Sequence, residues 1–181
     1  DGTKIVLMET ASRRILKSHD LEQEKVVFWK CISQETLALV TESSVYHWGI
    51  TDDSAANRQF KRHESLFGCK IVNYEVENGY AVLIGECEEV ALLSPFCLFR
   101  DFSSKMSTPT DGEAACFANF KMIENREPST LFLSSKKNDQ GGKLFVFEVG
   151  LVPIGNTPFS KSSIDVPFER SFDDDYPIFL Q

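Results

Sequence analysis

The chain has 181 residues, a formal net charge of −8 and five cysteines, at positions 31, 69, 87, 97 and 116. This length suits one domain with a substantial core, and the negative charge disfavours binding to nucleic acids. No apolar run is long enough to span a membrane, and no signal peptide opens the chain. The odd cysteine count, without a Cys-x-x-Cys pair, predicts free thiols and a cytosolic location.

Short strands are predicted from the first residues onward. Residues 3–9 and 12–17 are expected to pair as a hairpin that turns at residues 10–11. Apolar and polar residues alternate in the first of these strands, so its side chains should point to opposite faces in turn. One face is expected to hold Ile5 and Leu7, and the other Lys4, Val6 and Met8.

A three-strand pattern follows the hairpin. Apolar and aromatic runs at Val26–Trp29, Leu37–Thr41 and Val45–Trp48 are separated by short polar breaks, as in an antiparallel meander. None of these runs has the length or the 3.6-residue spacing of an amphipathic helix. The charged stretch Arg58–His63 is expected to form a solvated outermost strand.

The same unit recurs along the chain. Aromatic Trp29 has counterparts at Tyr74 and Phe120, and a fourth first strand is expected near Val166, at intervals of about 46 residues. Second strands are predicted at Leu37–Val40, Tyr80–Ile84, Thr130–Ser134 and Ile178–Leu180. Third strands are predicted at Val45–Trp48, Leu92–Arg100 and Lys143–Val149. Asn78 and Gly79 form the strongest hairpin signal, and Gly150–Phe159 is expected to be an irregular connection.

A period of this length with several strands per repeat is typical of β-propeller blades. The fold class predicted for the chain is therefore all-β, a β-propeller of which residues 1–181 form about four blades. Because an open ring leaves unpaired edges, we expect a partial propeller that starts and ends within a blade.

The sequence contains no recognisable catalytic or metal-binding pattern. His19, His47 and His63 lack ligand spacing, and no phosphate-binding loop or nucleophile elbow is present. Acid–base catalysis would require a carboxyl group held dry, which the turn around Glu86 and Glu88 does not suggest. We therefore expect no enzyme activity, no metal and no cofactor. An enzyme that uses the central channel would need polar residues converging from several blades.

The repeated motifs resemble the N-terminal domain of clathrin heavy chains, in order and over nearly the whole chain. The matching stretches are Phe28–Ser33, Leu37–Thr41, Ser44–Trp48, Arg62–Cys69, Ile71–Tyr74, Phe117–Met122, Ser129–Phe132, Gly141–Leu144 and Glu148–Gly150. The resemblance implies a seven-bladed, non-catalytic propeller of a vesicle coat, of which this chain covers roughly the second to fifth blades. It also implies a place on the cytosolic face of coated pits and vesicles.

The resemblance further implies partners. In the family, grooves between blades bind leucine-rich acidic peptides of endocytic adaptors, and light chains and other heavy chains bind through parts outside this chain. Membranes would be reached only through adaptors, and nucleic acid not at all. The alternative is an interaction module of another vesicle coat or assembly; a long α-solenoid after the propeller would distinguish the clathrin case.

Three candidate sites carry over from the resemblance. The first groove would use Lys4, Val6, Met8 and Arg13, with Arg14 as a stand-in cation. The family has polar residues at the first two positions, an aromatic residue at Met8 and a lysine at Ile15. The second groove would use Met106, Thr108, Phe147 and Lys161, while the family's arginine falls on Ser104. A top-face site would use Lys70 and Val72, where Lys70 replaces a neutral amide.

Overall fold

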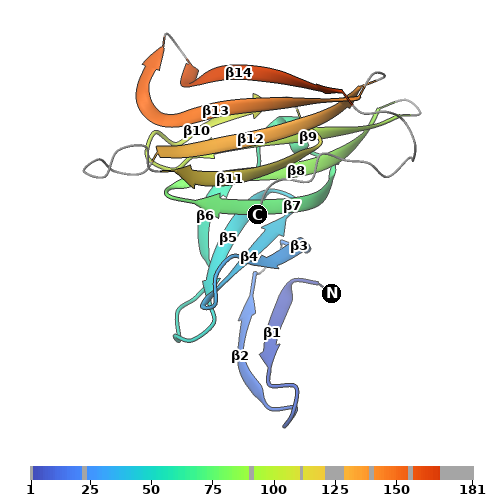
Figure 1. The fold of residues 1–181 in the computed structure, drawn as a ribbon. Helices are drawn as coiled ribbons and strands as arrows, with labels where there is room; N and C mark the ends of the chain where they lie inside the picture. Colours follow the sequence, from blue (N-terminus) through green and yellow to red (C-terminus); the bar gives the residue numbers. More distant parts are fainter. Residues whose placement is uncertain are drawn as a thin grey trace.

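In the described part of the chain, the strands form antiparallel sheets. The computed structural model describes residues 2–21, 24–89, 92–110, 112–120, 129–138, 141–154 and 157–167. These residues form a two-stranded ribbon and three four-stranded sheets that follow one another along the chain (Figure 1). In each sheet the strands pair in sequence order, as the meander pattern predicts.

The strands have the following bounds. The N-terminal ribbon consists of β1 (Lys4–Met8) and β2 (Ile15–Asp20). The first sheet consists of β3 (Val26–Cys31), β4 (Thr36–Thr41), β5 (Ser44–Gly49) and β6 (Asn57–Lys61). After the short 3-10 helix η1 (Glu64–Leu66), the second sheet consists of β7 (Lys70–Glu77), β8 (Tyr80–Glu89), β9 (Leu92–Asp101) and β10 (Met106–Thr110). The third sheet consists of β11 (Ala114–Phe120), β12 (Ser129–Asn138), β13 (Gly141–Ile154) and β14 (Thr157–Pro167).

The predicted first three repeats are confirmed. Trp29, Tyr74 and Phe120 lie in the first strands of the three sheets, and the predicted second and third strands are the two middle strands of each. The β7–β8 hairpin turns at Asn78 and Gly79, which have φ angles of 47° and 83°. Positive φ at both positions matches the right-handed twist of the paired strands.

The middle strands of the first two sheets bury both of their faces, because each of these sheets packs between two neighbours. In β4, Leu37 and Leu39 face a core shared with the ribbon, whereas Ala38 and Val40 face the second sheet. The same division continues in β8, where residues 81 and 83 face the first sheet and residues 82 and 84 face the third. Three apolar cores therefore separate four layers.

The expected fourth first strand is wrong. Val166 lies in β14, where it pairs with Gly142 as part of the outer strand of the third sheet. The spacing between Phe120 and Val166 suggested the start of a new repeat. However, β14 is the fourth strand of the meander that begins with β11, the strand of Phe120. The expected irregular connection at Gly150–Phe159 is also wrong, since β13 extends to Ile154 and β14 begins at Thr157. An irregular register between Val149 and Ile154 accommodates this stretch. The predicted strand at Ile178–Leu180 lies outside the described residues.

The recurring aromatic residues are equivalent in sequence but not in burial. Trp29 is 65% exposed, whereas Tyr74 is fully buried between the first and second sheets. Trp29 pairs with Leu39, on the face of the first sheet that the ribbon covers only in part. The layer that packs on each strand therefore decides whether the aromatic residue is part of a core.

The prediction that all cysteines are free thiols is wrong for two of them. The structure joins Cys69 and Cys87 by a disulfide. The register of β7 with β8 pairs Lys70 with Glu86, so the residue before one and the residue after the other face each other, with a Cα–Cα distance of 4.3 Å. Cys31, Cys97 and Cys116 are free, and burial raises the pKa of the Cys97 thiol to about 12.

His47 connects the first and second sheets. It points to the opposite face of β5 from Tyr46 and Trp48, where its Nε2 lies 3.0 Å from the Tyr74 hydroxyl. Its ring also packs edge-on against Phe102. Because this site is half-buried, desolvation lowers the pKa of His47 from 6.5 to about 4.

This lowered pKa predicts a pH-dependent stability. The unfolded chain binds a proton at His47 below about pH 6.5, whereas the folded chain binds one only near pH 4. The free energy of unfolding should therefore be highest above pH 6.5 and decrease as the pH falls toward 4. We expect His47→Gln to remove about 1 kcal/mol of this decrease. Thermal unfolding between pH 7.5 and 4.5 measures it, and equal pH dependence in both proteins would contradict the assignment.

Candidate functional site

The outer face of the N-terminal ribbon carries an exposed apolar strip. On β1, Val6 and Met8 point away from the core and are 43% and 52% exposed. Met8 pairs across the ribbon with Ile15 of β2, which is 61% exposed. Between these positions, Ile5 and Leu7 point the other way and pack near Trp48. Because side chains alternate along β1, one face of the strand packs toward the first sheet and the other face is exposed, as predicted.

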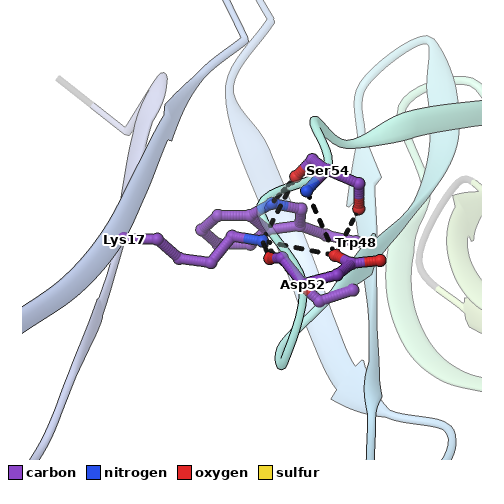
Figure 2. A network of polar contacts seen from close by, with 5 residues as sticks. Lys17, Trp48, Asp52 and Ser54 are labelled. Carbon is purple, nitrogen blue, oxygen red and sulfur yellow. Dashed lines mark hydrogen bonds and ion pairs between the residues drawn. The ribbon is translucent and has the colours of Figure 1, made fainter.

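A single lysine fastens the ribbon to the first sheet. The ammonium group of Lys17 on β2 donates hydrogen bonds to the carbonyl oxygens of Gly49, Asp52 and Ser54, at 2.7, 2.6 and 3.2 Å (Figure 2). It also lies 4.8 Å from the centre of the Trp48 ring, whose Nε1 donates to the same Ser54 carbonyl. Three carbonyl acceptors match the three N–H donors of an ammonium group.

The loop that receives Lys17 is ordered by its own hydrogen bonds. The hydroxyl and backbone N–H of Ser54 both donate to Oδ1 of Asp52, which lowers the pKa of that carboxyl group. The same oxygen lies 3.7 Å from the Lys17 ammonium (Figure 2). The side chain of Lys17 is mostly buried, whereas that of Asp52 is exposed. The carbonyl contacts therefore contribute more to holding the ribbon than the ion pair does.

Cations border the apolar strip. Lys4 is exposed on the same face of β1, at the end away from the turn. At the other end the turn carries exposed Arg13 and Arg14, and Arg13 adopts a φ of 55°. The Glu9 N–H donates to the Arg14 carbonyl at 2.9 Å and closes this turn. All four predicted residues of the first groove thus lie on the ribbon, around one apolar strip.

The residues of the second predicted groove have different environments. Met106 on β10 is 47% exposed, and Thr108 is half-buried on the same strand. Phe147 on β13 is buried in the core between the second and third sheets, stacked on Phe132. Lys161 is the backbone partner of Phe147 on β14. Met106 is therefore the exposed apolar member of this set.

The predicted top-face pair lies at the start of β7. The side chain of Lys70 is exposed and lies 3.9 Å from Glu86, its cross-strand partner. Val72 is half-buried and packs against the core between the second and third sheets. At this candidate site, Lys70 is therefore a cation already paired with Glu86, and Val72 is a half-buried apolar side chain.

Ile15 stands where the clathrin heavy chain family has a lysine. In the structure it extends the strip of Val6 and Met8, and exposed Leu16 adjoins it at a register shift in the ribbon. The expected turn at residues 10–11 would place Met8 opposite Arg13, whereas the observed pairing aligns Met8 with Ile15. With Ile15 at this position, the strip has three apolar side chains. An apolar ligand therefore fits it better than it would fit a strip with the family's lysine there.

The described residues offer little for other chemistry. No group of three His, Cys, Asp or Glu side chains among them could hold a metal ion. In the same part of the chain, no helix is long and apolar enough to cross a membrane. What this part of the molecule does present is exposed sheet surface.

Four-stranded meanders stacked in sequence order are the arrangement of β-propeller blades, so the fold is of the β-propeller class. No family model matches the chain. The chain is 44% identical over 182 residues to the probable clathrin heavy chain 1 of Caenorhabditis elegans. It is 40% identical over 168 residues to the clathrin heavy chain of Drosophila melanogaster, and 37% identical over 182 residues to clathrin heavy chain 2 of Homo sapiens.

These matches cover 92–99% of the chain and 10–11% of the relatives. The chain is homologous to clathrin heavy chains over nearly its whole length, and it spans about a tenth of the length of the curated relatives it matches. The resemblance seen in the sequence motifs is therefore confirmed.

The Lys17 contacts predict how the ribbon is held. In Lys17→Met the apolar stem remains but three hydrogen bonds are lost, so the ribbon should open more often. We expect the β1 and β2 amides to exchange hydrogen about tenfold faster, while the third sheet is unchanged. Lys4→Met, on the outer face, serves as the control and should leave exchange unaltered. Equal exchange in the two variants would show that the lysine contributes nothing to the anchor.

Proposed function

We propose that this chain is part of a vesicle-coat scaffold whose propeller recruits cargo adaptors by binding short leucine-rich acidic peptides. The observation that carries the proposal is the exposed strip of Val6, Met8 and Ile15, bordered by cations. The names of the homologous proteins support the coat role, since each is a clathrin heavy chain. The role is structural and non-catalytic.

The strip has the properties that such a peptide requires. An extended peptide directs alternate side chains to one face, so its leucines can lie on Val6, Met8 and Ile15 in turn. Lys4 and Arg13 at the two ends then attract the acidic residues, which favours association and orients the peptide. Methionine suits this position because its unbranched side chain adapts to different partners.

The ribbon is a suitable platform because its two faces have separate tasks. Ile5 and Leu7 hold it on the first sheet together with the Lys17 contacts. The outer side chains are therefore free to bind a ligand without loss of core packing. A peptide interface of this size should be transient, with a dissociation constant in the micromolar range, about −8 kcal/mol at 1 µM.

A second peptide site is proposed around Met106 and Thr108 on β10, with Lys161 as its cation. Exposure of Met106 supports this site, and buried Phe147 would support its wall from behind. A top-face site at Lys70 and Val72 is the third candidate, in which a ligand would have to compete with Glu86 for Lys70.

The remaining partners belong to the same proposal. Light chains and further heavy chains would bind through parts outside this chain. Membranes would be reached through adaptors, which places the propeller on the cytosolic face of coated pits and vesicles. Neither nucleic acid nor a cofactor has a part in this function.

Charge substitution in the strip tests the first site. Met8→Asp and Ile15→Asp should each weaken binding of a leucine-rich acidic peptide at least about tenfold, because each buries a carboxylate against leucine and repels the peptide. Val27→Asp is the control, since Val27 is also an exposed apolar residue and lies on β3, outside the strip. Fluorescence anisotropy with a labelled peptide measures the affinities. If all three variants bind like the parent protein, the strip is not the peptide site.

The second site is tested independently. Met106→Asp should weaken any peptide that binds on β10 about tenfold, while a peptide captured by the ribbon keeps its affinity. Competition between two labelled peptides, measured in the Met8→Asp and Met106→Asp variants, separates the sites. If both peptides lose affinity in both variants, the two grooves are not separate sites.

A further inference from the structure

A basic pocket lies between the first and second sheets, away from the apolar strip. One wall is formed where β6 ends and η1 begins, and the other by the β9–β10 hairpin. Its volume is about 490 Å³. We call it the basic pocket, and its polar lining comprises Lys61, Arg62, His63, Glu64, Arg100, Lys105 and Ser107.

The charge of this pocket is opposite to that of the chain. Four permanent cations and a histidine meet a single carboxylate, that of Glu64, whereas the whole chain carries a net charge of −8. No carboxylate among the described residues forms an ion pair with any of these basic groups. A concave cluster in which cations outnumber carboxylates creates a local positive field that attracts anions.

The two arginines are held in place by the protein itself. Arg62 is buried and donates through Nη1 to the Thr41 carbonyl at 2.9 Å, and through Nη2 to the carbonyls of Leu66 and Cys69. Arg100 donates through Nη1 to the Lys105 carbonyl and to the Ser107 hydroxyl, at 2.5 and 2.9 Å. Their positions therefore do not depend on a bound anion.

Both arginines nevertheless have an unused donor. The Nε atoms of Arg62 and Arg100 are buried and have no hydrogen-bond partner among the described residues. Burial lowers the pKa of both guanidinium groups, yet arginine stays charged at neutral pH. Glu42 near Arg62 and Asp101 near Arg100 offset part of the cost of this burial, and a bound anion would add to that compensation.

His63 adds a donor of defined direction. Its Nδ1 accepts a hydrogen bond from the backbone N–H of Ser65 at 3.3 Å, which leaves the proton of a neutral ring on Nε2. Lys61 and Lys105 are exposed on opposite walls, so their long side chains can close over a ligand from both sides. The pocket thus combines two arginines that are held by protein hydrogen bonds with two exposed lysines whose side chains can move.

We propose that the basic pocket binds the phosphate group of a phosphorylated peptide. A phosphate dianion offers three acceptor oxygens and more charge than a single carboxylate, which suits five convergent basic groups. Phe67, 59% exposed beside the pocket, provides an apolar contact for a neighbouring peptide residue. An anionic membrane surface fits less well, because the acidic chain as a whole would be repelled from it. This inference does not depend on the leucine-rich peptide sites.

Binding of a phosphoserine peptide to the protein tests the proposal. The probe is a fluorescein-labelled heptapeptide of glycine and serine with one central phosphoserine, compared with its unphosphorylated form. We expect the phosphorylated probe to bind at least about tenfold more tightly. The Lys61→Glu/Lys105→Glu double variant should lose at least about tenfold, because both residues are exposed and their charges are reversed. The matched control is Lys25→Glu/Lys136→Glu, which makes the same charge change on exposed lysines outside the pocket.

Each outcome has a definite meaning. Loss in the pocket variant but not in the control supports the proposal. Equal affinity for both peptides, or equal loss in both double variants, overturns it. Displacement of the probe by inorganic phosphate at the probe's own concentration would identify free phosphate as the ligand instead. Binding to phosphatidylinositol-phosphate vesicles with no binding to the peptide would assign the pocket to a lipid headgroup and would also overturn it.

Discussion

The face-to-face stacking of the sheets is the constraint on which the rest of the structure depends. A sheet between two others has no solvent face in its middle strands, so these strands must be apolar on both sides. Residues 37–40 of β4 and residues 81–84 of β8 satisfy this condition, with successive side chains entering different cores. Apolar burial of this kind is the main favourable contribution to the stability of each blade.

Polar contacts align the stacked sheets where their first strands meet. Lys30 on β3 binds Asn73 and Glu75 on β7, across the boundary between the first and second sheets. At the next boundary, Asn119 on β11 donates to Glu77 and accepts from Asn78. These contacts are directional, whereas apolar packing is not, so they define how one blade is placed on the next.

The candidate binding surfaces lie where this stacking leaves side chains uncovered. The ribbon has only one covered face, and its outer side chains Val6, Met8 and Ile15 are exposed. The basic pocket lies where the outer strand of one sheet and the hairpin of the next leave a gap. In both cases the cores provide a rigid support, and the surface residues provide the chemistry. Apolar and cationic surfaces on the same scaffold suit ligands of different kinds.

Much of the fold was predictable from local pattern. The first three repeats, the Asn78–Gly79 turn and the alternation in β1 were all readable, because strand periodicity and turn geometry depend on neighbouring residues. The expected strand near Val166 failed because equal spacing cannot distinguish the first strand of a new blade from the last strand of the preceding one. The prediction of free thiols was wrong for Cys69 and Cys87, because a count of cysteines contains no information on the register of the paired strands.

The sequence by itself determined most strands of the first three repeats, their meander order and the family resemblance, since these follow from residue patterns along the chain. Tertiary structure alone decided which aromatic residues are covered, as the contrast between Trp29 and Tyr74 shows. It also decided that Ile15 joins the apolar strip and that Arg62 and Arg100 share one pocket. The physical reason is that burial and charge density depend on residues that are distant in sequence, which only the pairing of strands and the stacking of sheets bring together.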